Sequence, residues 1–139
     1  MLLPWADHLG YDLAYLVMEE HKNFCFFVHQ ETRLVRVQCK TARLEKGGSC
    51  LAFNTVSVSA GKRGNLKKDY RGKAERFAVY LPENGKVYMI PVDIALCRKD
   101  MTLRFKSAGL LRGNSKRAYI VPYEEVTDPR FHWAEDYEL

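Results

Sequence analysis

The alternating residues 33–41 constrain the fold of this chain more than any other segment. Successive side chains of a β-strand point to opposite faces, so a two-residue period of apolar and polar residues predicts a strand. Arg36, Gln38 and Lys40 share one face. The opposite face, which suits a protein core, carries Val35, Val37 and Cys39. The strand therefore holds an amide and an ammonium group side by side.

A second strand-like segment, residues 10–17, carries Asp12 near its start. If the two segments pair, Asp12, Gln38 and Lys40 converge on one point and can hold a divalent metal ion and a water molecule. The alternative is an ordinary solvated surface, because an antiparallel strand commonly shows polar side chains to water.

Length and composition predict one domain over residues 1–139, large enough to bury a core and too small for two. The hydrophobic content of 47% and the charged content of 28% are typical of globular proteins. No apolar run reaches the roughly 18 residues of a membrane span, and the N-terminus does not resemble a signal peptide. We therefore expect no membrane partner.

The four cysteines are scattered and form no Cys-x-x-Cys pair. Their number permits two disulfides, but three of them fall in β-patterned stretches that we expect to be buried. This favours reduced thiols in a cytoplasmic protein. A zinc site is not favoured, because the cysteines and histidines lack the ligand spacing of a zinc finger.

Charge is distributed in blocks. Residues 62–76 hold seven basic and two acidic residues, residues 98–117 hold seven basic and one acidic, and the tail at 124–139 holds six acidic and one basic. Basic blocks suit the phosphates of a nucleic acid, with a solvated surface as the alternative. The candidate phosphate contacts are Lys67, Lys68, Arg71, Lys73, Arg112, Lys116 and Arg117.

β-strand signals dominate the pattern along the chain. We expect strands at 11–18, 24–29, 34–41, 50–57, 76–82 and 86–91, with short extended pieces at 103–105 and 118–121. Asn84 and Gly85 predict a type I′ hairpin turn, residues 59–72 predict a polar basic loop, and residues 92–98 predict a helix after Pro91. The acidic tail is expected to be irregular or weakly helical. These elements indicate an α+β domain with a mixed or antiparallel sheet.

Several strings resemble the PD-(D/E)XK nuclease superfamily. Tyr-Asp-Leu at 11–13 with Arg-Val-Gln-Cys-Lys-Thr-Ala at 36–42 is similar to its active-site strands. More specifically, these strings resemble a subgroup in which Gln-x-Lys replaces the usual acid-x-Lys. That subgroup includes group I intron-encoded homing endonucleases. Strings at 68–73, 76–80 and 87–91 resemble the same proteins in the same order, so the resemblance spans about residues 7–122.

The resemblance implies a restriction-endonuclease-like α+β (α/β) fold, a central mixed β-sheet with flanking helices. It also implies a Mg²⁺-dependent DNA endonuclease. Asp12 would bind the metal together with the main-chain carbonyl of Cys39, and Gln38 would take the place of the second acid. Lys40 would orient or polarise the attacking water. Magnesium suits this chemistry, because it prefers hard oxygen ligands and keeps several waters.

Two departures from the family pattern matter. The N-terminal helix whose glutamate usually supports the metal is expected to be missing or shortened; Asp7 is a substitute carboxylate, or a helix cap or turn residue. Residues 18–32 form an aromatic insertion, either extra core, a longer hairpin, or a dimer contact.

Three functions follow. The first is an endonuclease that acts on double-stranded DNA as a homo-oligomer, a dimer or tetramer, because cutting both strands of a paired site needs two active centres. The second is a weakened or inactive DNA-binding relative of the same fold. The third is a protein-interaction module.

Overall fold

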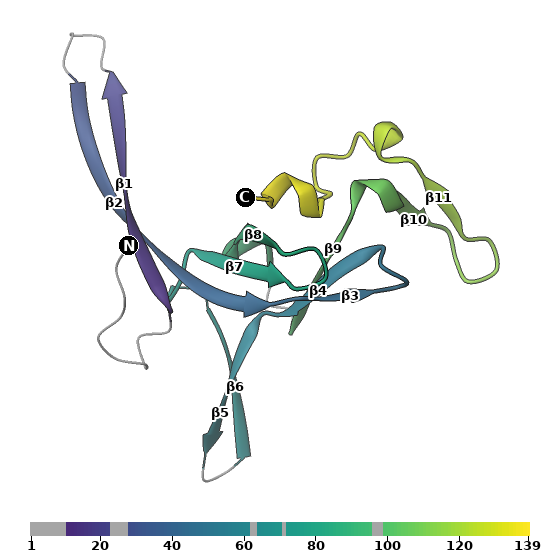
Figure 1. Cartoon of the computed structure of the whole chain (residues 1–139), viewed down its shortest axis with the longest axis horizontal. Coiled ribbons are helices and arrows are strands. Elements are labelled where there is room, and N and C mark those ends of the chain that lie inside the picture. Colours follow the sequence, from purple (N-terminus) through teal and green to yellow (C-terminus); the bar gives the residue numbers. More distant parts are fainter. Residues whose placement is uncertain (1–10, 23–27, 62–63, 71, 96–98) are drawn as a thin grey trace.

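The computed structural model describes residues 11–22, 28–61, 64–70, 72–95 and 99–139. Its main sheet has four strands in the order β1-β2-β7-β8 (Figure 1). These are β1 (Leu13–Lys22), β2 (Val28–Thr41), β7 (Arg76–Leu81) and β8 (Lys86–Pro91). β1 and β8 run antiparallel to their neighbours, whereas β2 and β7 are parallel. The predicted mixed sheet is therefore confirmed.

The hairpin of β1 and β2 is longer than the sequence pattern predicted. The two strands pair continuously from Leu13 opposite Val37 to Lys22 opposite Val28. The backbone of the aromatic insertion thus extends the hairpin, which was one of the interpretations left open. Its phenylalanines at 24, 26 and 27 lie outside the described residues.

The crossover from β2 to β7 replaces a helix with hairpins. Parallel neighbours need a crossover connection, and that connection is usually an α-helix. Here residues 42–75 supply it with β3 (Arg43–Glu45), β4 (Cys50–Asn54), β5 (Val56–Gly61) and β6 (Gly64–Asp69). β4 lies between β3 and β9 (Asp100–Arg104) in a second sheet. β5 and β6 form a hairpin that stands away from the body (Figure 1), so the loop predicted at 59–72 is largely wrong.

The flanking helices expected from the fold class are not found in the described residues. These residues form only 3-10 turns: η2 (Val92–Ala95), η3 (Lys106–Ala108), η4 (Tyr123–Glu125) and η5 (Ala134–Tyr137). Within the helix predicted at 92–98, the described residues form the 3-10 turn η2, which buries Val92 and Ala95 at a three-residue spacing. Residues 96–98 lie outside the described part of the chain. No helix in the described part of the chain is long and apolar enough to cross a membrane.

The turn between β7 and β8 differs in type from the prediction. Pro82 to Gly85 form a four-residue loop between β7 and β8, and only Gly85 in it has a positive φ, of 68°. The type I′ turn predicted at Asn84 and Gly85 is therefore wrong. Lys46 and Gly47 instead have φ angles of 52° and 67°, and Gly48 N donates to Glu45 O. Positive φ at both central positions is the mark of a type I′ turn.

The core lies between the main sheet and the β3-β4-β9 sheet. Phe77 of β7 meets Phe53 of β4 edge-to-face, with ring centroids 5.5 Å apart and both side chains fully buried. The main sheet adds Val79, Leu81, Tyr88 and Ile90, and the second sheet adds Leu51, Met101 and Leu103. Burial of such side chains from water is the main stabilising contribution.

The C-terminal segment is an ordered part of this body. β10 (Leu110–Arg112) and β11 (Tyr119–Val121) form a hairpin, and the chain then returns through η4 and η5 to the edge of β8 (Figure 1). Leu139 N donates to Val87 O at 3.0 Å, and Glu138 forms an ion pair with Lys86. Trp133 and Ala134 are buried. The acidic tail therefore neutralises specific partners within the fold.

Candidate active site

Asp12 lies against β2 at the point where its pairing with β1 ends. The Asp12 amide donates to Val37 O at 2.7 Å, continuing the strand pairing by one residue. Asp12 Oδ2 then accepts two hydrogen bonds, one from Gln38 Nε2 and one from the backbone amide of Cys39, both at 2.6 Å. The structure thus brings together Asp12, Gln38 and the backbone of Cys39, as the sequence predicted.

The polar face of β2 is on the core side of the sheet. Gln38 is paired with Phe77 and Lys40 with Val79, and residues directly opposite each other share a face. Both partners on β7 are fully buried, whereas Gln38 and Lys40 are partly exposed. The site therefore lies at the border of the core. On the opposite face Val35 and Val37 are buried as expected, but Cys39 is exposed.

Lys40 is held by a tyrosine from the crossover. Its Nζ donates to Tyr70 Oη at 3.2 Å and lies 4.5 Å from the centre of the Tyr70 ring. Tyr70 is only 6% exposed. Lys40 leaves β2 at the position after Gln38 on the same face, and its ammonium group is held at Tyr70.

Arg36, the third polar residue of this face, is paired with Glu75. Arg36 Nη2 lies 2.6 Å from Glu75 Oε1, and the Arg36 backbone amide donates to Glu75 Oε2 at 2.6 Å. The hydrogen bonds from Arg36 lower the pKa of the Glu75 carboxyl, and those to Glu75 raise the pKa of Arg36. Glu75 stands directly before β7, so the pair ties β2 to β7 beside the site.

Oxygen atoms at this site suit magnesium. The amide and carbonyl of one strand residue point to the same side, so the Cys39 carbonyl lies on the strand edge that its amide shares with Asp12. The Asp12 carboxylate and the Cys39 carbonyl are hard oxygen donors, the type that Mg²⁺ prefers, and Mg²⁺ usually keeps several waters. Gln38 would add its amide oxygen after rotation of the amide group, whose nitrogen faces Asp12. In the described part of the chain, no three His, Cys, Asp or Glu side chains lie close enough together to hold a metal ion. Asp7 lies outside the described residues.

The Cys39 thiol is a poor nucleophile and metal ligand at neutral pH. Desolvation by the surrounding sheet raises its pKa, and the Asp12 carboxylate nearby raises it further. Because the thiolate is the reactive form, the side chain of Cys39 contributes little chemistry. Cys39 contacts Asp12 through its backbone amide.

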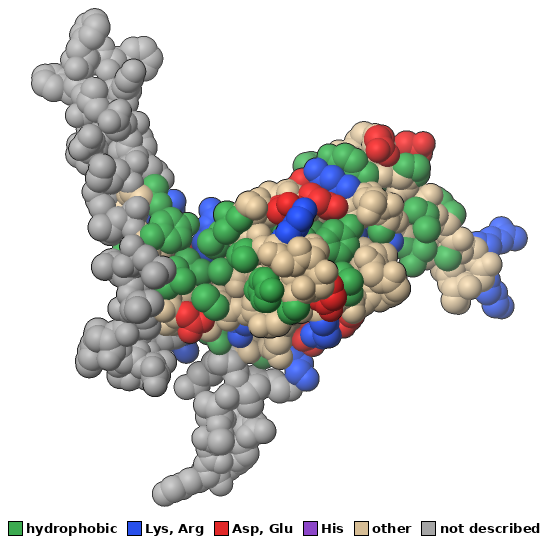
Figure 2. Space-filling view, in the orientation of Figure 1, with side chains coloured by type: hydrophobic (Ala, Val, Ile, Leu, Met, Phe, Trp, Pro, Cys, Tyr) green, Lys and Arg blue, Asp and Glu red, His purple; other side chains and the backbone are tan. Residues whose placement is uncertain are grey.

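The candidate phosphate contacts fall on two hairpins and a turn. Lys67 and Lys68 are on β6, opposite Val58 and Ser57. Lys73 follows in the turn after Tyr70. Arg112 ends β10, and its guanidinium lies 5.2 Å from the centre of the Phe131 ring. Lys and Arg side chains project from the β10–β11 hairpin in Figure 2. Arg71 and the side chains of Lys67 and Lys68 lie outside the described part of the structure.

The tip of the β10–β11 hairpin is shaped by Gly113. Its φ is 92°, and a Cβ there would approach Arg117 O to 2.1 Å, so only glycine fits. Asn114 Oδ1 accepts hydrogen bonds from the backbone amides of Lys116 and Arg117, both at 3.1 Å. The backbone of this basic turn is thus defined while its side chains are exposed.

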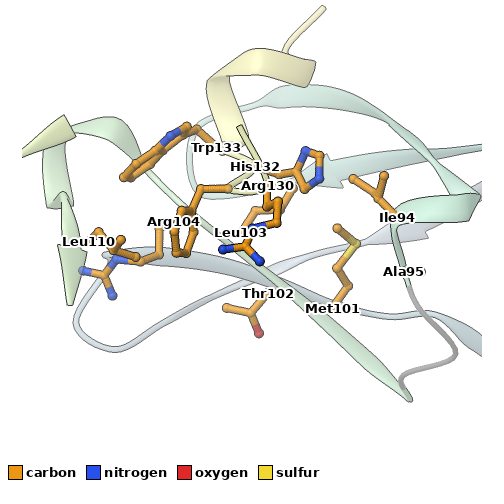
Figure 3. A pocket seen from close by; sticks show the side chains of 11 residues that line it. Ile94, Ala95, Met101, Thr102, Leu103, Arg104, Leu110, Arg130, His132 and Trp133 are labelled. Carbon is orange, nitrogen blue, oxygen red and sulfur yellow. The ribbon is translucent and has the colours of Figure 1, made fainter. Parts of the chain in front are cut away.

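A separate cavity of about 360 Å³ lies between β9 and the C-terminal segment (Figure 3). Its floor is apolar, with Met101, Leu103 and Leu110. The guanidinium of Arg104, on the wall of the cavity, donates hydrogen bonds to the carbonyl oxygens of Ala108 and Gly109 and so stabilises the local backbone. Asp12, Gln38 and Lys40 do not line this cavity, which therefore belongs to the packing of the C-terminal segment.

Comparison with solved structures shows that the fold is shared with a protein of known structure. The chain is similar to a bacterial homing endonuclease, I-Ssp6803I, with a TM-score of 0.54 and 19% identity; the match covers 99% of this chain and 72% of that one. No curated protein sequence matches the chain. The sequence profile of the PD-(D/E)XK endonuclease family matches residues 1–117, so the chain belongs to that family. The resemblance inferred from the sequence strings is confirmed.

Two residues of the site neighbourhood were missed at the sequence level. These residues are Glu75 and Tyr70. Their partners, Arg36 and Lys40, lie 39 and 30 residues away in the chain. Parallel pairing of β2 with β7 brings Glu75 close, and periodicity within a single strand carries no signal of that pairing.

Proposed function

We propose that this protein is a Mg²⁺-dependent endonuclease that hydrolyses phosphodiester bonds of double-stranded DNA. The observation that carries the proposal is the contact of Asp12 with Gln38 and the Cys39 backbone, with Lys40 next on the same face. Family membership supports a nuclease function in general, and the particular residues, metal and substrate are our proposal.

The residues would divide the work as follows. Asp12, the Gln38 amide oxygen and the Cys39 carbonyl would hold the metal, which when bound supplies a more acidic water and a counter-charge for the phosphate. Lys40 would orient the attacking water and stabilise the negative charge that builds on the scissile phosphate. Its ammonium group is suited to this because it offers three hydrogen-bond donors and no acceptor.

The basic hairpins would bind the DNA backbone. The proposed contacts are Lys67 and Lys68 on β6, Lys73 in the turn after Tyr70, Arg112 at the end of β10, and Lys116 and Arg117 between β10 and β11. Arg71 is proposed from the sequence alone. Exposed cations on hairpins can follow phosphates, and each contact releases counterions. A homo-oligomer, dimer or tetramer, would supply the second active centre needed to cut both strands.

A plasmid cleavage assay tests the proposal. Protein with supercoiled plasmid and Mg²⁺ should produce nicked or linear DNA, and EDTA, Lys40→Ala or Asp12→Asn should abolish the products. Size-exclusion chromatography with light scattering measures the oligomer. Intact plasmid with wild-type protein and Mg²⁺ would contradict the proposal.

One observation favours a second function, a weakened or inactive DNA-binding relative. Among the described residues the site has a single carboxylate, Asp12, beside a neutral amide. One charge binds Mg²⁺ more weakly than two. Salt-dependent DNA binding without cleavage at millimolar Mg²⁺ would establish this alternative.

A further inference from the structure

Tyr70 combines burial with a direct contact to Lys40. Tyr70 is 6% exposed, yet its hydroxyl accepts a hydrogen bond from Lys40 Nζ. The centre of its ring lies 4.5 Å from the same nitrogen atom. A buried tyrosine hydroxyl usually finds a partner. Here the partner is the side chain that the proposed mechanism places at the scissile phosphate.

The tyrosine is itself rigidly held. Its ring meets Phe77 edge-to-face, with centroids 5.7 Å apart and planes at 88°, and Phe77 packs in turn on Phe53. Its carbonyl accepts hydrogen bonds from the amides of Lys73 and Ala74, both at 3.0 Å. Both the backbone and the ring of Tyr70 are therefore fixed by the core.

Lys40, in contrast, has a flexible side chain of four carbons, which adopts many rotamers unless something selects one. A hydrogen bond to Tyr70 together with the ring contact restricts the ammonium group to one region. Groups held in the reactive geometry beforehand avoid an entropic cost during the reaction.

We infer that Tyr70 is a positioning residue that sets the location of the Lys40 ammonium group for phosphodiester hydrolysis. The inference rests on the proposed nuclease function. Tyr70 acts through Lys40, and it need not touch DNA or metal. The hydroxyl supplies the direction of the contact, and the ring supplies a cation–π attraction that remains without the hydroxyl.

Tyr70→Phe tests the inference, because it removes the hydroxyl and keeps the ring. Tyr88→Phe is the matched control. Tyr88 is also buried, and its hydroxyl also accepts a hydrogen bond, from Asn84 Nδ2 at 2.9 Å in the β7–β8 loop. Both variants lose one buried hydroxyl contact, so a purely structural effect should be similar in the two.

Two measurements are made on each variant. Acylation by sulfo-NHS acetate, followed by mass spectrometry, gives the reactivity of Lys40 relative to Lys46 in the β3–β4 turn. Single-turnover plasmid cleavage with Mg²⁺ gives the rate constant, and DNA titration gives the Kd. For Tyr70→Phe we expect several-fold faster acylation of Lys40 and about tenfold slower cleavage with an unchanged Kd. Tyr88→Phe should match the wild type in Lys40 acylation, in the cleavage rate constant and in the Kd.

The outcomes distinguish the positioning role of Tyr70 from the proposed nuclease function. If Lys40→Ala abolishes cleavage while Tyr70→Phe matches the wild type in rate and in Lys40 acylation, the positioning role is overturned and the nuclease function stands. Equal changes in Tyr70→Phe and Tyr88→Phe also overturn it, since they indicate loss of stability alone. If the wild type does not cleave with Mg²⁺, the nuclease function and the positioning role fall together.

Discussion

The amide nitrogen of Gln38 lies 2.6 Å from a carboxylate oxygen of Asp12, so the neutral side chain of Gln38 is a hydrogen-bond donor to the carboxylate. A carboxylate at position 38 would face Asp12 as a like charge. The neutral glutamine avoids that repulsion. A glutamine at position 38 also adds no negative charge with which a metal ion could be held.

Gln38→Glu should make the stability of the protein depend on Mg²⁺. Two carboxylates at this distance repel each other, which raises the pKa of one of them and lowers the melting temperature in EDTA. With Mg²⁺ the added charge should lower the half-saturating metal concentration for cleavage by about tenfold. Thermal melts with and without Mg²⁺, and a metal titration of cleavage, measure both effects.

The control is Gln38→Leu, which keeps similar size and adds no charge. It should melt at the same temperature with and without the metal. An equal response of the Glu and Leu variants to Mg²⁺ would argue against metal binding next to residue 38.

Glu75→Gln should lower stability at neutral pH and have less effect in acid. Hydrogen bonds from Arg36 lower the folded-state pKa of Glu75 below its ordinary value of 4.5. The pair thus contributes stability above about pH 4.5, and that contribution is lost as pH falls through the lowered pKa. The two side chains are 31% and 37% exposed, so solvent screening limits the loss to about 1 kcal/mol or less.

Urea unfolding of both proteins between pH 7 and pH 3 measures this difference. Glu83→Gln, in the exposed β7–β8 loop, is the control and should match the wild type at pH 7. A difference between wild type and Glu75→Gln that grows as pH falls would have the wrong sign for this account.

Trp133→Ala should destabilise the whole domain. Trp133 is 5% exposed and meets Tyr123 edge-to-face at 5.2 Å, although it lies in the acidic tail. Removing a buried tryptophan leaves a cavity and costs about 3–5 kcal/mol in the free energy of unfolding. Chemical denaturation gives the value. Leu139→Ala, where the side chain is 77% exposed, should change it by less than about 0.5 kcal/mol.

Lys116→Ala combined with Arg117→Ala should weaken DNA binding and reduce its dependence on salt. Each lost phosphate contact lowers the slope of log K against log salt by about one, so the double variant should lose about two. Fluorescence anisotropy at several salt concentrations measures the slope. Lys46→Ala in the β3–β4 turn is the control for loss of a single exposed charge, and an unchanged slope in the double variant would remove this hairpin from the DNA-binding surface.

The part of the site that depends on segments adjacent in the sequence could be predicted. Alternation in residues 33–41 places Gln38 and Lys40 on one face, and pairing of two successive strands brings Asp12 to them. The environment of that face was not predictable. Partners from β7, such as Phe77, place it on the core side of the sheet, because the parallel register depends on contacts across the whole crossover. The same is true of the loop expected at 59–72, which instead contributes to the β5–β6 hairpin.

The hairpin-built crossover also affects the order in which the molecule can assemble. Asp12 and Gln38 come together through an antiparallel pair that closes locally, whereas β2 can join β7 only after residues 42–75 have been arranged. Pairings between distant segments form slowly, because the intervening chain loses freedom before it gains contacts. A partly folded chain would thus hold the carboxylate and amide while the ammonium group still moves freely, so the proposed hydrolytic activity would be the last property that the molecule acquires.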